Sequence, residues 1–298
     1  MKGKAAFSIL RQTAKEWNED KAPMLGASLA YYTVFSLAPL LIISIAIAGL
    51  IFGEEAARGR VYEQLHSLLG EQGGKATEAM VESAGARRAT GIAASITGVV
   101  ALLVGASGVF GQLQTSLNII WGVEPKSNRG ILGIVKERFL SFGFILVVGF
   151  LLLVSLILTS AVAAATQWVG TFTHSAEIVA HGLNFILSFG IVTVLFALLF
   201  KFLPDAIIAW RDVWLGAAIT AALFTIGKFI LGIYLGRASV SSSYGAAGSL
   251  IVLLLWVYYS AQILFFGAEF TQVWANRFGK AVLPARGAER RGRGDEER

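Results

Sequence analysis

Six long stretches of this chain contain no charged side chain, and this pattern restricts the fold more than any other feature. A transmembrane helix needs about 20 apolar residues to cross roughly 30 Å of hydrocarbon. In lipid, the backbone polar groups must be satisfied within the spanning structure itself. The sequence therefore predicts an all-α polytopic membrane protein. The uncharged stretches are residues 22–52, 89–123, 139–176, 178–200, 213–227 and 238–268.

Within these stretches we expect six transmembrane helices, the fifth of which runs through Lys228, the only charged residue between Asp212 and Arg237. Composition agrees, because 15% of the residues are charged, compared with about a quarter in soluble domains. The absence of cysteine excludes disulfides and thiol chemistry. The helices are expected near residues 30–52, 92–114, 139–166, 179–201, 213–235 and 247–272.

Lys and Arg are divided unevenly between the two sides of the predicted membrane domain. Of the 25 Lys and Arg residues, 18 fall on the side of both termini, six fall on the other side, and Lys228 lies within a span. Because cytoplasmic loops are enriched in Lys and Arg, both termini are expected in the cytoplasm. Basic segments beside membrane ends attract anionic lipid head groups. We therefore attribute the net charge of +6 to the membrane and not to nucleic-acid binding.

The sequence predicts one membrane domain between two shorter segments. Residues 1–29 are expected to form a cytoplasmic amphipathic segment, and residues 30–275 the six-helix membrane domain with an outer loop at 53–91. Residues 276–298 are expected to be a disordered basic cytoplasmic tail, because few apolar residues follow Leu283.

Amphipathic helices are expected in both the N-terminal segment and the first outer loop. Apolar residues recur at helical spacing over residues 5–18, which is typical of a helix lying on a membrane surface. A similar face in the outer loop either packs on the bundle or covers a cavity mouth. The two faces comprise Phe7, Leu10, Ala14 and Trp17, and Val61, Leu65, Leu68 and Leu69.

Polar residues and proline within or beside the spans are the candidate functional groups, because intramembrane charge is costly and usually faces a protein interior or a water-filled cavity. Pro39 lacks a backbone N–H and is expected to kink the first span, and Ser36 can offer a compensating hydrogen bond. The candidates are Lys228, Glu269, Gln262, Pro39, Ser36, Tyr32, Gln112 and Tyr244.

Several of these residues keep two interpretations. Lys228 either extends its long stem to the outer interface or contacts a substrate in a polar cavity. Gln112 and Gln262 either line a cavity or bond between helices, and the second role is more common. Glu269 follows Gly267-Ala268, whose small side chains allow close helix approach. We expect its carboxylate to face the bundle interior near the cytoplasmic end.

Three groups of motifs carry a family resemblance. The first predicted span contains Gly-Ala-Ser-Leu-Ala-Tyr-Tyr-Thr-Val-Phe-Ser-Leu-Ala-Pro at residues 26–39. Further motifs are Leu203-Pro204-Asp205, Trp210-Arg211, Gly216-Ala217, Tyr244-Gly245-Ala246-Ala247-Gly248, Leu255-Trp256-Val257-Tyr258 and Gly267-Ala268-Glu269. Over about residues 10–275 the chain resembles the YihY/BrkB family of bacterial inner-membrane proteins. The resemblance implies a six-helix fold in that membrane. Serum resistance, virulence and ribonuclease BN activity have been attached to family members.

The residues do not support a ribonuclease. Metal-dependent hydrolysis needs clustered His, Asp or Glu ligands. His174, Glu177 and His181 have helical spacing, but they fall on the predicted outer side, away from cytoplasmic RNA. No phosphate-binding loop of the Walker type is present. We therefore expect no catalytic site, metal or cofactor.

Two classes of function fit the pattern. A transporter or exporter of a small solute or lipid-like molecule would use intramembrane charge and broken helices. A structural or regulatory membrane protein, acting in envelope integrity or serum resistance, would use the same spans as a scaffold. The lipid bilayer is the expected partner, nucleic acid is not expected, and a homo-oligomer stays open.

Overall fold

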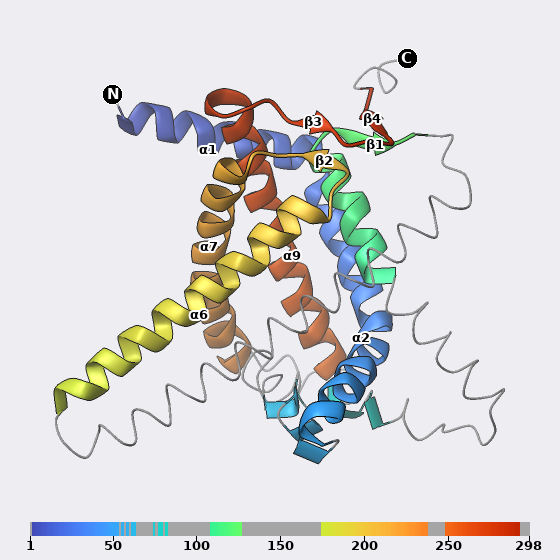
Figure 1. Cartoon of the computed structure of the whole chain (residues 1–298), viewed down its shortest axis with the longest axis vertical. Coiled ribbons are helices and arrows are strands. Elements are labelled where there is room, and N and C mark those ends of the chain that lie inside the picture. Colours follow the sequence, from blue (N-terminus) through green and yellow to red (C-terminus); the bar gives the residue numbers. More distant parts are fainter. Residues whose placement is uncertain are drawn as a thin grey trace. The chain divides into compact units, whose positions relative to one another are not determined.

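The chain folds into long helices with short strands near some of their ends (Figure 1). The computed structural model describes residues 2–53, 55–56, 58–59, 61–63, 74, 77–79, 81–82, 108–126, 174–237 and 248–292. The elements are α1 (Lys2–Glu19), α2 (Ala22–Phe52), β1 (Val123–Pro125), α6 (His174–Phe202), β2 (Ala206–Ile207), α7 (Trp210–Arg237), α9 (Gly248–Phe278), β3 (Leu283–Pro284) and β4 (Ala288–Arg290). Residues 108–120 are also helical.

Three described helices are long and apolar enough to cross a membrane. The candidate spans are Phe185–Phe202 in α6, Trp210–Leu231 in α7 and Leu250–Phe278 in α9. They coincide with the fourth, fifth and sixth predicted spans. The 31-residue helix α2 covers the first. The second is described only from residue 108, and the third lies outside the described residues. The total of six therefore stays a prediction.

The first span begins earlier than the sequence pattern predicted. Lys21 adopts a left-handed conformation with φ 55° between α1 and α2, and its N–H donates to the Asn18 carbonyl at 3.1 Å. Pro23 lies in the first turn of α2, where its fixed φ suits a helix start. The helix therefore begins at Ala22, not near residue 30, and it continues through Pro39.

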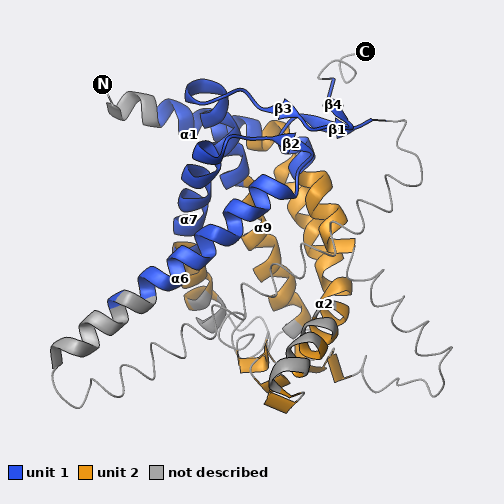
Figure 2. Cartoon of the chain, viewed as in Figure 1, with its two compact units in different colours: residues 1–16, 117–225, 266–298 blue, residues 17–116, 226–265 orange. Residues whose placement is uncertain are grey.

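The chain divides into two compact units, which are coloured separately in Figure 2. Unit 1 comprises residues 1–16, 117–225 and 266–298, and unit 2 comprises residues 17–116 and 226–265. Unit 1 contains most of α1, all of α6, the four strands, the first part of α7 and the end of α9. Unit 2 contains α2 and the remaining parts of α7 and α9.

The C-terminal segment of unit 1 is ordered up to residue 292, which corrects the predicted disordered tail from residue 276. Helix α9 continues to Phe278, β3 then pairs antiparallel with β2, and β4 pairs antiparallel with β1. Val282 and Ala288 are buried. Short apolar contacts and backbone pairing thus hold a segment whose composition suggested disorder. Residues 293–298 lie outside the described residues.

Each unit has its own apolar core. In unit 1, Ile9 of α1 packs with Phe270 and Val273 of α9, and Figure 1 shows α1 running across the end of α9. The helix predicted over residues 5–18 is thus confirmed as α1. In unit 2, the core joins α2 to the first loop, where Tyr62 packs. Burial, with Glu78 and Glu82 acting in the same direction, raises the pKa of the Tyr62 phenol, whereas Arg58 opposes the rise.

Candidate functional site

Glu269 is the most deeply buried charged group in the described part of the chain, with an exposed fraction of 0%. It lies on α9 in unit 1, directly after Gly267 and Ala268, which are also buried. A buried carboxylate is costly unless the surrounding groups compensate for lost water. The structure therefore places Glu269 inside its unit, where the sequence predicted it. Its functional role stays a prediction.

The face of α9 that carries Gly267 and Thr271, which lies roughly half a turn round the helix from Glu269, packs on α7 through a reciprocal pairing of glycine and threonine. A Cβ atom added to Gly216 would lie 1.7 Å from Thr271 Oγ1, and one added to Gly267 would lie 1.9 Å from Thr220 Oγ1. Thr220 follows Gly216 by one helical turn, and Thr271 follows Gly267 in the same way. The antiparallel helices therefore exchange the same contact twice, and each threonine needs the glycine opposite.

The threonine hydroxyls are satisfied within their own helices. Thr220 Oγ1 donates to the Gly216 carbonyl at 2.7 Å, and Thr271 Oγ1 donates to the Gly267 carbonyl at 2.6 Å. Both threonines are completely buried. Small residues and hydroxyls of this kind allow close packing in membranes. The sequence predicted the small-residue face at Gly267-Ala268, but nothing in it identified the threonine opposite.

Asp212 forms a second buried carboxylate in unit 1, near the first turn of α7. Its exposed fraction is 2%, and its Oδ2 accepts a hydrogen bond from the backbone N–H of Lys280 at 3.4 Å. A Cβ atom on Gly279 would lie 2.2 Å from the same oxygen. The end of α9 therefore lies against the start of α7, where a negative charge interacts favourably with the helix dipole.

Asp205 joins three segments of unit 1, a role the sequence analysis missed. The Asn118 side chain accepts a hydrogen bond from the Asp205 N–H at 2.7 Å and donates one to Asp205 Oδ2 at 3.1 Å. The Asp205 carbonyl accepts a bond from the N–H of Ala285 at 2.8 Å. The Leu203-Pro204-Asp205 motif thus holds residues 117–120 and the C-terminal strands together. The strand pairs β1–β4 and β2–β3 are only three and two residues long. Such short strands show no alternation of apolar and polar residues from which they could be predicted.

Two further buried oxygens lie where α1 meets α9. Neither Thr13 Oγ1 nor Gln272 Oε1 has a recorded hydrogen-bond partner among the described residues. Gln272 lies three residues beyond Glu269, so both share one side of α9. Thr13 lies one turn beyond Ile9, which packs on α9. Buried polar atoms normally have partners, and these two atoms extend the polar character of the unit 1 interior beyond Glu269.

The remaining sequence candidates that the structure describes lie in unit 2. Tyr32 Cδ1 and Ser36 Oγ of α2 would each lie 3.4 Å from a Cβ atom on Gly108, so these residues meet there. Gln262 Nε2 donates to the Ala22 carbonyl at 3.5 Å and lies against Gly26. The Gln262 bond matches the interhelical interpretation.

Gln112 and Lys228 are not brought together in a common site among the described residues. Gln112 donates to Ser116 Oγ at 3.4 Å within its own helix. Lys228 is exposed, and so are its neighbours Phe229 and Ile230. Which of the two interpretations of Lys228 holds stays a prediction. Tyr244 lies outside the described residues.

The residues whose spacing was considered for a metal site, and not predicted to form one, are described only in their backbone. Helix α6 begins at His174, so His174, Glu177 and His181 lie on successive helical turns. Their side chains are outside the description. Among the residues that are described, no group of three His, Cys, Asp or Glu side chains is placed to hold a metal ion.

Comparison with known proteins identifies the family to which these motifs belong. The model of the virulence factor BrkB family matches residues 13–292. This chain belongs to the BrkB family. The match confirms the resemblance seen in the motifs. It also extends that resemblance past residue 280, to include the C-terminal strands.

The relatives that match this chain are named as UPF0761 membrane proteins. UPF0761 membrane proteins of Ralstonia nicotianae and Verminephrobacter eiseniae are 28% and 29% identical, over 88% and 87% of this chain and 57% and 60% of their own lengths. One from Teredinibacter turnerae is 29% identical over 92% of this chain and 63% of its own length. The chain thus spans about three fifths of these relatives. No solved structure matches it.

Proposed function

We propose that this BrkB-family chain transports or exports a small solute or lipid-like molecule across the bacterial inner membrane, with Glu269 as its central charged group. The single observation behind this proposal is a fully buried carboxylate within a candidate span. Intramembrane charge is expensive and commonly marks a substrate or ion pathway. The proposal includes a non-enzymatic role, a multi-pass chain and both termini in the cytoplasm.

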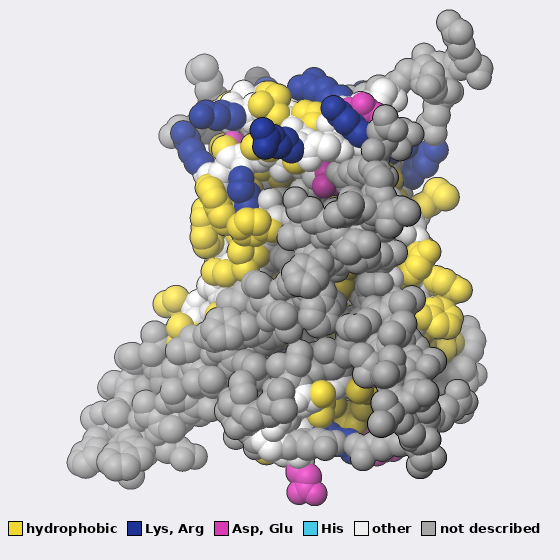
Figure 3. All heavy atoms as spheres, turned by 45° about the vertical axis from the view of Figure 1, so that its right-hand side comes forward, with side chains coloured by type: hydrophobic (Ala, Val, Ile, Leu, Met, Phe, Trp, Pro, Cys, Tyr) yellow, Lys and Arg dark blue, Asp and Glu magenta, His cyan; other side chains and the backbone are white. Residues whose placement is uncertain are grey.

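The distribution of basic residues supports this orientation. Figure 3 shows Lys and Arg side chains gathered at the end of unit 1 that carries α1 and the strands. Exposed basic residues at this end include Arg11, Lys15, Arg211, Arg277 and Lys280. Such enrichment is typical of the cytoplasmic side.

The test is a flux measurement on the full chain in proteoliposomes. The probes are fluorescent organic cations, fluorescent organic anions and head-group-labelled phospholipids. We expect the wild type to move at least one class, and Glu269→Gln, which keeps the shape and removes the charge, to lower that flux about tenfold or more. Glu289→Gln on the exposed strand β4 is the matched control and should keep wild-type flux.

A scaffold without transport activity is the second candidate, favoured by the close packing of α7 on α9 in unit 1. Glycine–threonine contacts of this kind leave little room between the two helices at that level. Wild-type vesicles that move none of the three probe classes would favour the scaffold. Wild-type flux in a correctly inserted Glu269→Gln variant would instead refute the role of the carboxylate while leaving transport standing.

A further inference from the structure

The junction between α6 and α7 carries a cluster of large aromatic side chains on the surface of unit 1. Phe202, Trp210 and Trp214 are 61%, 42% and 46% exposed. The rings of Phe202 and Trp210 lie 5.8 Å apart, and those of Trp210 and Trp214 lie 6.4 Å apart. We call these three residues the aromatic face. Tryptophan favours the boundary between head groups and acyl chains, so the aromatic face is suited to that depth.

The ends of the two candidate spans are consistent with this depth. One span ends at Phe202 and the next begins at Trp210. The connection between them, which contains β2, therefore lies beyond the apolar segments and beside the lipid head groups. The apolar and polar parts of a lipid would meet the protein at this junction.

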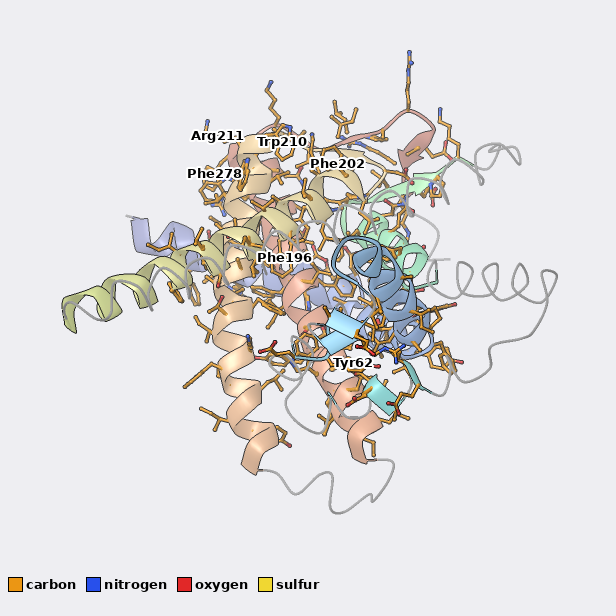
Figure 4. The ribbon with its side chains drawn as sticks, turned by 60° about the horizontal axis from the view of Figure 1, so that its bottom comes forward. Tyr62, Phe196, Phe202, Trp210, Arg211 and Phe278 are labelled. Carbon is orange, nitrogen blue, oxygen red and sulfur yellow. The ribbon has the colours of Figure 1, made fainter. Side chains whose placement is uncertain are left out.

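Two cations stand next to the aromatic face. Lys201 Nζ lies 5.6 Å from the centre of the Trp210 ring and donates a hydrogen bond to the Ile208 carbonyl. These contacts hold the ammonium group at the junction, and an ammonium has several N–H donors, so others are left for a ligand. Arg211, which follows Trp210, is exposed. Figure 4 shows Arg211, Trp210 and Phe202 at the same end of the ribbon.

The nearest carboxylates in sequence are directed elsewhere. Asp212 is buried and accepts the N–H of Lys280, and Asp205 is bound to Asn118. The junction therefore presents positive charge beside exposed apolar rings. This combination is complementary to one chemical class, a lipid with an anionic head group.

We propose that Lys201 and Arg211 bind the phosphate group of an anionic phospholipid whose acyl chains lie against the aromatic face. The site is separate from the buried carboxylate Glu269, and it does not depend on whether the protein transports anything. It assigns the membrane attraction of this chain to one junction instead of to its basic segments as a whole.

The test measures quenching of tryptophan fluorescence by brominated lipids around the reconstituted full chain. Brominated phosphatidylglycerol is compared with brominated phosphatidylcholine, and the ratio of quenching gives the preference for the anionic lipid. We expect the wild type to prefer phosphatidylglycerol. The double variant Lys201→Gln/Arg211→Gln should lose about fivefold in preference for each charge removed.

The control variant is Arg290→Gln/Arg291→Gln, which removes two exposed charges from the same unit at the end of β4, a strand that pairs with β1 and not with the connection between α6 and α7. We expect it to keep the wild-type preference, and an equal loss would show that general surface charge is responsible. Lys201→Arg should keep the preference and Lys201→Gln should lower it, which covers the case of a double variant that does not insert. A wild type that is quenched equally by brominated phosphatidylglycerol and brominated phosphatidylcholine would overturn the proposal of a lipid site. Excess inorganic phosphate should leave the preference intact at constant ionic strength, and its loss would identify a free-anion site instead.

Discussion

In unit 1, Gly216 of α7 and Gly267 of α9 face short threonines, whereas in unit 2 Gly26 faces the amide end of Gln262 and Gly108 has more space. Added Cβ atoms at Gly216 and Gly267 would fall within 2 Å of a threonine hydroxyl and within 3 Å of the threonine Cβ. An added Cβ atom at Gly26 would lie 2.0 Å from Gln262 Nε2, but 3.2 Å from its Cδ. At Gly108 the nearest atoms are 3.4 Å away.

This difference shows that the tolerance of a close helix contact depends on how freely the side chain opposite the glycine can move. Threonine is β-branched and stiff at χ1, and Thr271 and Thr220 are further held by their own hydrogen bonds. Glutamine can move its amide end by rotating several bonds. Unit 1 is therefore expected to tolerate almost no added volume between α7 and α9, while the contacts of Gly26 and Gly108 in unit 2 are expected to adjust.

The largest effect is expected from Gly216→Ala. The new methyl group would occupy the position of the Thr271 side chain, so the helices must separate, and we expect a loss of about 3 kcal/mol in the free energy of unfolding. The measurement is unfolding in mixed micelles with increasing sodium dodecyl sulfate. Gly190→Ala is the control, because its Cβ atom meets nothing within 4 Å.

The same experiment has a rescue arm. Adding Thr271→Ala to Gly216→Ala removes the colliding hydroxyl and methyl groups and leaves the Cβ contact at 2.7 Å, so it should recover part of the lost stability, as expected for residues in contact. If Gly216→Ala is as stable as Gly190→Ala, the helix pair in unit 1 is not closely packed and the comparison fails.

A smaller effect is expected from Gly26→Ala in unit 2. The Gln262 amide must turn aside and give up its long hydrogen bond to the Ala22 carbonyl, which should cost about 1 kcal/mol. In a Gln262→Ala background the same substitution should be close to neutral when unfolding is measured under identical conditions. A loss as large as that of Gly216→Ala would mean that both units are equally rigid.

The smallest effect is expected from Gly108→Ala. The new methyl group would make ordinary contacts with Tyr32 and Ser36, while alanine favours the helix by up to about 1 kcal/mol over glycine. The unfolding free energy should therefore stay unchanged or rise slightly. A clear destabilisation would place α2 closer to residue 108 than the structure does, and Tyr32→Ala would then relieve it.

Local patterns in the sequence were enough to predict the helices that the structure describes. Residues 178–200 and 238–268 lack charge because each apolar helix must satisfy its backbone internally and expose apolar side chains to lipid, and α6 and α9 lie there. The helical spacing of Phe7, Leu10 and Ala14 predicted α1, because it places apolar side chains on one face of a helix. The inward position of Glu269 followed from the small residues before it.

Contacts between distant segments could not be predicted in the same way. The pairing of Asn118 with Asp205 joins residues 87 positions apart, and no periodicity relates them. The predicted tail of residues 276–298 was judged by composition alone, which describes how a segment would behave by itself. Its strands β3 and β4 form because β2 and β1 offer backbone partners, and that information lies elsewhere in the chain.

By itself, the sequence determined that this protein is helical and belongs in a membrane, because hydrophobicity and helical spacing act within single segments. Only the tertiary structure decided that Thr271 would face Gly216, that Asp205 would hold the C-terminal strands, and that Lys228 would be exposed. Those outcomes depend on which helix faces lie against each other, and a helix with apolar residues all round leaves its own packing face undetermined.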